Sequence, residues 1–305
     1  MSAPREGRGA PQSLPDNRLV RRPPTLPRRV GSLRATLATV ALHAALVLMA
    51  VAAMLPLLWM VSASLMPTGE ATAVPLRWVP SAPTLEHYRT LFERMELGRQ
   101  LLNSVIVASI TTGLAVLVNG MAGYAFAKLA FRGRDRIVRL MLLALVVPGQ
   151  IGMLPLFLLV RQMGLVNTLA GVVVPGLTSI FGILLVRQYA LSIPDSILDA
   201  ARVDGAGELG VFRRIALPLV VPILATLAVF TFLGAWNDFL WPLVVLADET
   251  RYTLPVGLAS LAGEHVQDTE LMMAGAVITV APAVLLFVVL QRYYLAGIMG
   301  GGVKE

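Results

Sequence analysis

The residues whose types and spacing suggest chemistry gather in one polar segment, at about residues 192–217, between two long apolar blocks. The segment contains Asp199-Ala200-Ala201 and then Asp204-Gly205-Ala206, and it ends at Ile215, Leu217 and Pro218. The first six of these residues are small or charged, unlike the apolar residues that dominate the blocks on either side.

The same segment carries the signals of a helical hairpin. Pro194 suits the first turn of a helix, and Asp195 and Ser196 suit its N-terminus. Gly205 permits a break, because glycine adopts left-handed dihedrals without steric cost. A second short helix then runs through Leu209, Phe212 and Ile215. We therefore predict a helix–turn–helix hairpin that lies outside the membrane, between two spans.

Nucleotide-binding motifs are not supported by their context. Residues 205–210 match G-x-G-x-x-G, but that fingerprint needs a preceding strand in a parallel sheet, and the flanks here are apolar spans. A Walker A loop needs Gly-Lys-Ser/Thr, and Lys128 and Lys304, the only lysines, follow Ala127 and Val303. No ATP site is predicted in this chain, so an ATP-driven process would need a separate ATPase.

Catalytic and metal-binding constellations are also not predicted. His43, His87 and His265 are scattered over one apolar block and two connections, without metal-ligand spacing. The chain has no cysteine, which excludes disulfides and thiolate chemistry. No histidine is placed to complete a hydrolase triad with a serine and an aspartate. We predict no catalytic residue, no metal and no cofactor in this chain.

Four polar residues within the apolar blocks are candidates for a translocation pathway: Asn119, Gln150, Asn237 and Asp238. Intramembrane carboxylates usually mark a pathway or a buried pair. Asp238 lies near one end of its block beside Trp236 and Trp241, so it also fits an interfacial acid within a tryptophan belt. The amides also fit hydrogen bonds between helices. The sequence leaves these alternatives open.

The elements that must position these residues are membrane spans. Hydrophobic residues make up 56% of the chain and charged residues 14%, against about 25% charged in a soluble globular protein. A helix needs about 20 apolar residues to cross about 30 Å of hydrocarbon. Six blocks satisfy this length: Leu37–Val61, Leu101–Ala127, Ile137–Val160, Leu169–Leu191, Leu219–Leu246 and Leu271–Leu295. We predict an all-α polytopic membrane protein with six transmembrane helices.

Basic residues set the predicted orientation and domain limits. They concentrate in residues 1–34, in the connection after the second block and in the 192–217 segment. The positive-inside rule then places both termini in the cytoplasm. Residues 1–34 are rich in Arg and Pro, which predicts a disordered cytoplasmic tail, and residues 35–305 form the transmembrane domain. An amphipathic stretch, Leu85–Leu97, lies in the first external loop.

The 199–218 pattern resembles the "EAA" loop of importer-type ABC permeases, the binding-protein-dependent family. Asp199 replaces the usual Glu of that loop, so the charge is kept and the reach is shorter. Further likeness spans about residues 55–305. It includes Pro83-Thr84-Leu85-Glu86-His87-Tyr88, Gly123-Tyr124-Ala125-Phe126-Ala127, Trp236-Asn237-Asp238-Phe239 and the Gly-rich end. These segments resemble the carbohydrate branch and, within it, subunits of the maltose-permease G type.

The resemblance implies a function and a set of partners. The chain would form half of a pathway for a sugar, beside a second homologous permease subunit in a bacterial plasma membrane. Its loop would form coupling helices on two cytoplasmic ATPase subunits, which would bind ATP and Mg. An extracellular solute-binding protein would deliver the sugar, and no nucleic acid is expected. The alternatives are another solute class, or a secondary transporter driven by an ion gradient, which would need a mid-membrane carboxylate or a broken helix.

Overall fold

Helices make up all the regular structure in the described part of the chain. The structure is a computed structural model that describes residues 33–94, 96–264 and 268–300. Its α-helices are α1 (Leu33–Ala63), α2 (Glu86–Arg94), α3 (Leu97–Lys128), α4 (Arg134–Ala144), α5 (Met153–Gln162), α6 (Leu169–Val173), α7 (Ile180–Ala190), α8 (Asp195–Val203), α9 (Glu208–Val211), α10 (Leu217–Trp236), α11 (Leu240–Val245), α12 (Leu254–Glu264) and α13 (Thr269–Gly300). Shorter turns are η1 (Gly149–Gly152), η2 (Val174–Leu177), η3 (Phe212–Ala216) and η4 (Glu249–Arg251). Among the described residues, the all-α prediction is confirmed.

Five helical segments in the described residues are long and apolar enough to cross a membrane. They are Ala35–Ala63, Leu97–Lys128, Leu169–Ala190, Glu208–Trp236 and Thr269–Leu286. In the most apolar window of each segment, no more than 33% of the residues are buried within the chain. Water would oppose so much exposed apolar surface, so lipid or a partner helix must cover it. The chain is therefore a multi-pass membrane protein.

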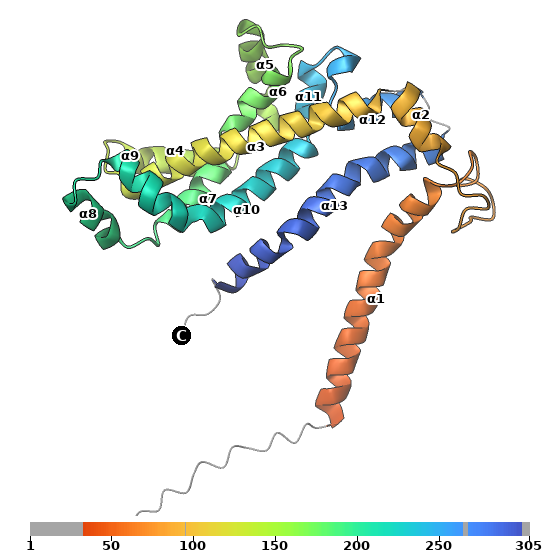
Figure 1. The fold of residues 1–305 in the computed structure, drawn as a ribbon, viewed down its shortest axis with the longest axis horizontal. Coiled ribbons are helices and arrows are strands. Elements are labelled where there is room, and N and C mark those ends of the chain that lie inside the picture. Colours follow the sequence, from red (N-terminus) through yellow and green to blue (C-terminus); the bar gives the residue numbers. More distant parts are fainter. Residues whose placement is uncertain (1–32, 95, 265–267, 301–305) are drawn as a thin grey trace, which may run out of the picture. The chain divides into compact units, whose positions relative to one another are not determined.

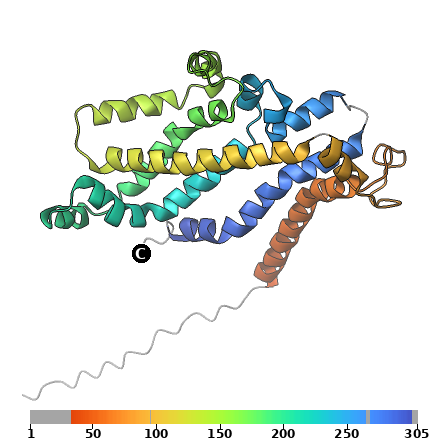
Figure 2. The ribbon, with the colours of Figure 1, turned by 45° about the horizontal axis from the view of Figure 1, so that its top comes forward.

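The predicted third span, Ile137–Val160, is not one straight helix. Two helical stretches, Arg134–Ala144 and Gly149–Gln162, replace it, and they are bent by 103° to one another. Figure 2 shows the chain changing direction between α4 and α5. Pro148 explains the break, because a proline disfavours helical dihedrals at the residue before it and has no N–H to donate. Counting this pair as one broken span gives six.

The fifth predicted span also ends earlier than expected. The block Leu219–Leu246 predicted one helix, but α10 stops at Trp236 and a separate short helix, α11, follows. Asn237 leaves the regular helix with a φ of −92° and a ψ of 1°. The break places Asp238 between two helices instead of within one.

The described residues fall into two units, which meet between Met54 and Leu55 of α1. In the first unit, helix α1 is exposed on every side up to Met54. In the second unit, α3 packs along α7 and α10, as Figure 1 shows. The predicted amphipathic stretch forms α2, which contacts α13 and α3.

Small residues on α3 allow its close approach to α7. The sequence places Ala108, Thr112, Ala115, Asn119 and Gly123 along this helix. A Cβ atom added at Gly123 would lie 2.6 Å from Cβ of Val186. Ala108 and Asn119 are fully buried. These contacts are made within the chain, so bundle packing explains the stripe.

Candidate functional site

The predicted hairpin is present in the described backbone. Its first helix is α8, which follows Pro194 in an extended conformation. Gly205 has a φ of +85°, in the left-handed region that glycine adopts readily. The second arm is α9, and it continues through the π-helical turn η3 into α10. The second arm is therefore continuous with a membrane span.

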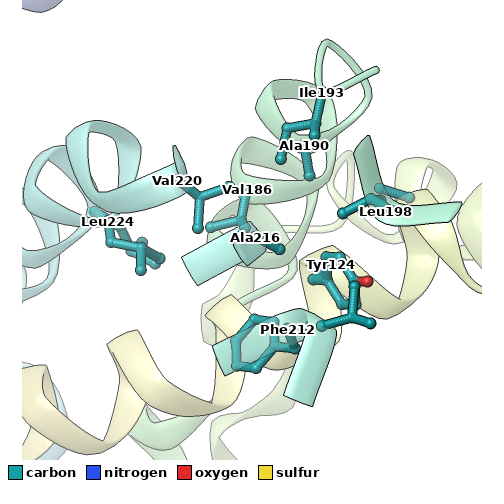
Figure 3. Packing of buried hydrophobic residues seen from close by; sticks show 12 residues of the cluster. Tyr124, Val186, Ala190, Ile193, Leu198, Phe212, Ala216, Val220 and Leu224 are labelled. Carbon is teal, nitrogen blue, oxygen red and sulfur yellow. The ribbon is translucent and has the colours of Figure 1, made fainter. Parts of the chain in front are cut away.

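A buried apolar cluster holds the hairpin against the spans. Leu198 is fully buried, and it packs with Tyr124 of α3 and Phe212 of η3, as Figure 3 shows. The Tyr124 and Phe212 ring centroids lie 5.1 Å apart. Ala190 of α7 and Ala216 of η3 complete the packing. The hairpin is thus held at its base against α3 and α7.

Lys128 fastens the start of α8 to the end of α3. Its Nζ donates to the Ile193 carbonyl at 2.6 Å and to Oδ1 of Asp195 at 2.7 Å. The Lys128 side chain is only 5% exposed, and its hydrogen bond lowers the pKa of Asp195 below the ordinary value. The sequence analysis missed this role, because a basic residue at the end of a span also reads as an orientation signal.

Arg202 links the two arms of the hairpin. Its Nη1 donates to Oδ1 of Asp199 at 2.7 Å, and its Nε donates to Oε1 of Glu208 at 2.8 Å. The bond to Asp199 lies within α8, and the bond to Glu208 crosses the turn at Gly205. They stiffen the tip, although pairs this exposed contribute only about 0–1 kcal/mol. The Asp199 carboxylate, predicted to face a partner, already has one partner inside the hairpin and remains 64% exposed.

The predicted contact residues divide into an outer set and an inner set. Asp199, Ala200, Asp204 and Gly205 are exposed, and Pro218 is exposed in the first turn of α10. Ala201, Ala206, Ile215 and Leu217 are partly buried and pack against the cluster around Leu198. The exposed outer set is accessible to a partner protein. The partly buried inner set holds the hairpin against the spans.

The outward surface of the hairpin is unexpectedly apolar. Val203 is 87% exposed, Leu209 is 72% exposed and Ile197 is 45% exposed. The sequence analysis placed Leu209 on the second helix without predicting its exposure, because the helical period alone does not say which apolar residues lack a neighbour. Exposed apolar side chains grouped in this way mark a contact with another protein or with lipid.

A second candidate site is a pocket of about 370 Å³ between α3, η2, α7, α10 and α11. Its polar lining includes Thr111, Ser179, Thr231 and Asp238. The hydroxyl of Thr111 is buried, and it has no hydrogen-bond partner in the described residues. Ser179, Thr231 and Asp238 are partly exposed, so these polar residues are accessible to a ligand.

Aromatic rings also line this pocket. Phe181 of α7 and Phe230 of α10 meet edge to face, with ring centroids 6.1 Å apart. Their exposed apolar faces can pack against the hydrocarbon face of a small molecule. The sequence analysis missed both residues, because a phenylalanine in a span reads first as lipid-facing.

Of the four predicted pathway residues, Asp238 alone is among the residues that line this pocket. Gln150 is exposed in η1, and Asn237 is exposed at the end of α10, where its Nδ2 donates to the Leu233 carbonyl. Trp236 and Trp241 are 1% and 8% exposed. They are core residues of the chain, so the interpretation as a tryptophan belt is wrong.

Asn119 does not line the pocket, but it supports a residue that does. It is fully buried, and its Oδ1 accepts from the backbone N–H of Ser179 at 2.9 Å. Its Nδ2 donates to the Ala115 carbonyl at 2.7 Å. The bond from Ser179 satisfies a backbone group where the chain is non-helical between η2 and α7, which is needed wherever a helix breaks at membrane depth. Asn119 positions Ser179, which does line the pocket.

The comparison with known families now decides the class of protein. Residues 119–299 match the family described as "Binding-protein-dependent transport system inner membrane component". The chain belongs to this family. The match covers the buried cluster around Leu198, the hairpin and, apart from Val107 and Thr111, the residues that line the pocket. Membership makes the chain a permease component of an ABC transport system, and not itself an enzyme.

Three relatives of this permease extend over most of its length. The arabinooligosaccharides transport system permease protein AraQ of Halalkalibacterium halodurans is 40% identical over 83% of this chain and 91% of its own. The trehalose transport system permease protein SugB of Mycobacterium tuberculosis is 34% identical over 83% and 93%. The diacetylchitobiose uptake system permease protein NgcG of Streptomyces coelicolor is 32% identical over 85% and 87%.

A solved structure shares the permease fold. A chain from a bacterial ABC transporter involved in the import of the acidic polysaccharide alginate superposes with a TM-score of 0.76. The two chains are 23% identical, and the match covers 86% of this chain and 98% of that one. At this identity the similarity concerns the fold.

Proposed function

We propose that this permease forms half of the translocation pathway of an ATP-driven carbohydrate importer. The relatives described above are named for the transport of arabinooligosaccharides, trehalose and diacetylchitobiose, which supports a sugar as the solute. A second, homologous permease subunit forms the other half. An extracellular solute-binding protein delivers the sugar, and two cytoplasmic ATPase subunits bind ATP and Mg.

The hairpin is the observation that carries this proposal. Its base is buried around Leu198, and its tip exposes Val203 and Leu209. A tip that is apolar and firmly seated fits a cleft on a separate subunit. Because α9 continues into α10, closure of the ATPases would tilt a whole span.

The orientation follows from charge. Arg132, Arg134 and Arg136 lie in the connection that follows α3, on the same predicted side as the hairpin. The positive-inside rule puts this side, both termini and the tail 1–34 in the cytoplasm of a bacterial cell. The tail falls outside the described residues, and residues 35–305 form the transmembrane domain.

The pocket beside Asp238 is the proposed part of the pathway. Sugars present both hydroxyl groups and apolar ring faces, so a lining with Thr111, Ser179, Asp238 and two phenylalanine rings is suited to them. The pocket is open on one side, where the second permease subunit would complete it. Asp238 accepts hydrogen bonds there from hydroxyl groups of the sugar.

Affinity purification of the tagged chain from its native host, followed by mass spectrometry, tests this proposal. We expect a second permease and an ATPase to accompany the wild-type chain. The variant Ala200→Trp places a large ring on the exposed face of α8 and should lose the ATPase. The control Ala130→Trp adds the same ring to an exposed alanine of the other connection on this side and should keep it.

Two outcomes would contradict the proposal. Recovery of a lone chain or a homodimer, without an ATPase, would favour a transporter driven by an ion gradient. Retention of the ATPase by the Ala200→Trp variant would place the contact elsewhere on the chain.

A further inference from the structure

A second charged surface lies outside both sites, in the connection between α3 and α4. The chain forms a hollow of about 630 Å³ there, and its lining includes four arginines and one acid. These are Arg132, Arg134, Arg136, Arg139 and Asp135. The hollow carries a strong positive charge, and neither the hairpin nor the pathway uses it.

Of the four arginines, one pairs with a carboxylate in the part of the chain that the structure describes. Asp135 accepts from Nε of Arg134 at 3.0 Å, and Arg139 donates to the backbone carbonyl of Asp135. Within the described residues, Arg132 and Arg136 have no hydrogen bond or ion pair. Exposed guanidinium groups close together repel one another, and a bound phosphate would remove that repulsion through bidentate hydrogen bonds.

The apolar surface beside this hollow indicates the source of the phosphate. Arg136, Leu140 and Leu143 lie at positions i, i+4 and i+7 of α4, so they form one stripe along the helix. Leu140 is 64% exposed and Leu143 is 67% exposed. The stripe extends about 10 Å from the arginine into the predicted membrane. A soluble phosphate compound would leave these leucines uncovered, whereas an acyl chain covers them.

The position of the hollow matches the depth of lipid head groups. It begins two residues after Lys128, where the span Leu97–Lys128 ends, and it includes the aromatic ring of Phe131. Aromatic and basic side chains are common at this boundary. Basic pockets next to transmembrane helices on the cytoplasmic side bind acidic head groups.

We propose that this hollow binds the head-group phosphate of an anionic phospholipid, and that one of its acyl chains lies along Leu140 and Leu143. Arg136 and Arg139 hold the phosphate from the first turns of α4. The lipid thereby fixes the start of α4, which is the helix that precedes the 103° bend. The inference concerns lipid binding and does not depend on the transported solute.

Lipid retention by the purified protein tests the proposal. The full-length chain is purified in mild detergent with the subunits that accompany it. It is then equilibrated with detergent micelles that contain both phosphatidylcholine and phosphatidylglycerol. Native mass spectrometry then counts each bound lipid. The variant Arg136→Gln/Arg139→Gln should lower the affinity for phosphatidylglycerol about thirtyfold, for two arginine contacts of this kind. Binding of phosphatidylcholine should not change.

The matched control is Arg213→Gln/Arg214→Gln. It removes the same charge from two exposed arginines on the same predicted side, and it should retain phosphatidylglycerol. Equal loss in both double variants would show attraction by net charge alone and would overturn the proposal. No loss in either variant would also overturn it.

Two further experiments identify the ligand. Leu140→Ser/Leu143→Ser should weaken phosphatidylglycerol retention, and excess inorganic phosphate should not strip the lipid from the wild-type chain. Displacement by inorganic phosphate would assign the hollow to a free phosphate group and contradict the lipid. Loss of an accompanying subunit from Arg136→Gln/Arg139→Gln, with the lipid retained, would make the hollow a protein contact.

Discussion

At the scale of single residues, a lysine and a glycine on α3 fix how the hairpin and the spans meet. Lys128 ties α3 to the start of α8 through two hydrogen bonds. Gly123 lets α3 lie against α7 with its Cα close to Val186 and to the carbonyl of Ile183. Both residues act through contacts between different helices.

Replacing Lys128 with methionine is expected to loosen the hairpin while the spans stay folded. The variant keeps a long side chain and loses the bond to the Ile193 carbonyl, which is worth roughly 1 kcal/mol. Amide exchange of residues 193–204 should therefore rise several-fold, as measured by mass spectrometry. Asp195→Asn keeps a hydrogen-bonding side chain and should have a smaller effect. Unchanged exchange in Lys128→Met would show that the buried cluster alone holds α8.

Gly123→Ala is expected to destabilise the bundle. The added Cβ would lie 2.9 Å from the Ile183 carbonyl oxygen as well as 2.6 Å from Cβ of Val186, and overpacking of this kind costs about 1–3 kcal/mol. Gly113→Ala on the same helix is the control, because nothing lies within 4 Å of its added Cβ. Thermal denaturation in detergent should show a lower midpoint for Gly123→Ala alone. Equal midpoints would mean that α3 and α7 can separate at little cost.

At the scale of elements, breaks in helices create the functional surfaces. The break between η2 and α7 opens the pocket wall at Ser179, and the break after α10 brings Asp238 into the same pocket. The turn at Gly205 folds α8 back along α9. The regular helices form the membrane spans, and the breaks between helices position the side chains of the pocket and the hairpin.

The turn at Gly205 gives a prediction about coupling. Gly205→Val forces a branched side chain to a φ of +85°, where a Cβ costs roughly 1–2 kcal/mol. We expect a chain that is folded in the membrane but has lost ATP-driven uptake. Gly207→Val is the matched control, since Gly207 has a φ of −67° and open space around it. Wild-type uptake in Gly205→Val would exclude the turn from coupling.

At the scale of the whole molecule, the chain exposes surfaces that neighbouring molecules would have to cover. Its pocket is open on one side, its hairpin tip is apolar and exposed, and its spans bury no more than a third of their most apolar windows within the chain. Each uncovered surface corresponds to a proposed neighbour, namely the second permease, the ATPase and the lipid bilayer.

Uptake by the reconstituted transporter distinguishes an ATP-driven importer from a gradient-driven transporter. With labelled arabinooligosaccharide or trehalose as the test solute, we expect vanadate to abolish uptake after reconstitution with ATP. An uncoupler that collapses the proton gradient should leave that reconstituted uptake intact. The opposite sensitivities would support the gradient-driven alternative, and uptake of neither sugar would point to another solute.

The sequence by itself determined the spans and the hairpin. Long apolar blocks must become helices in lipid, because the backbone has no water to bond with. Pro194 and Gly205 fix the start of α8 and the turn after it through local dihedral preferences, so the hairpin could be located without tertiary contacts.

Only the tertiary structure decided which side chains face one another. Local patterns cannot show that Asn119 bonds to Ser179, that Lys128 reaches Asp195, or that Asp238 shares a pocket with Thr111. These pairs join residues far apart in the sequence, and their meeting depends on how the helices pack. The sequence analysis predicted Ile137–Val160 as one span, and only the structure shows that its two helical stretches are bent by 103° to one another.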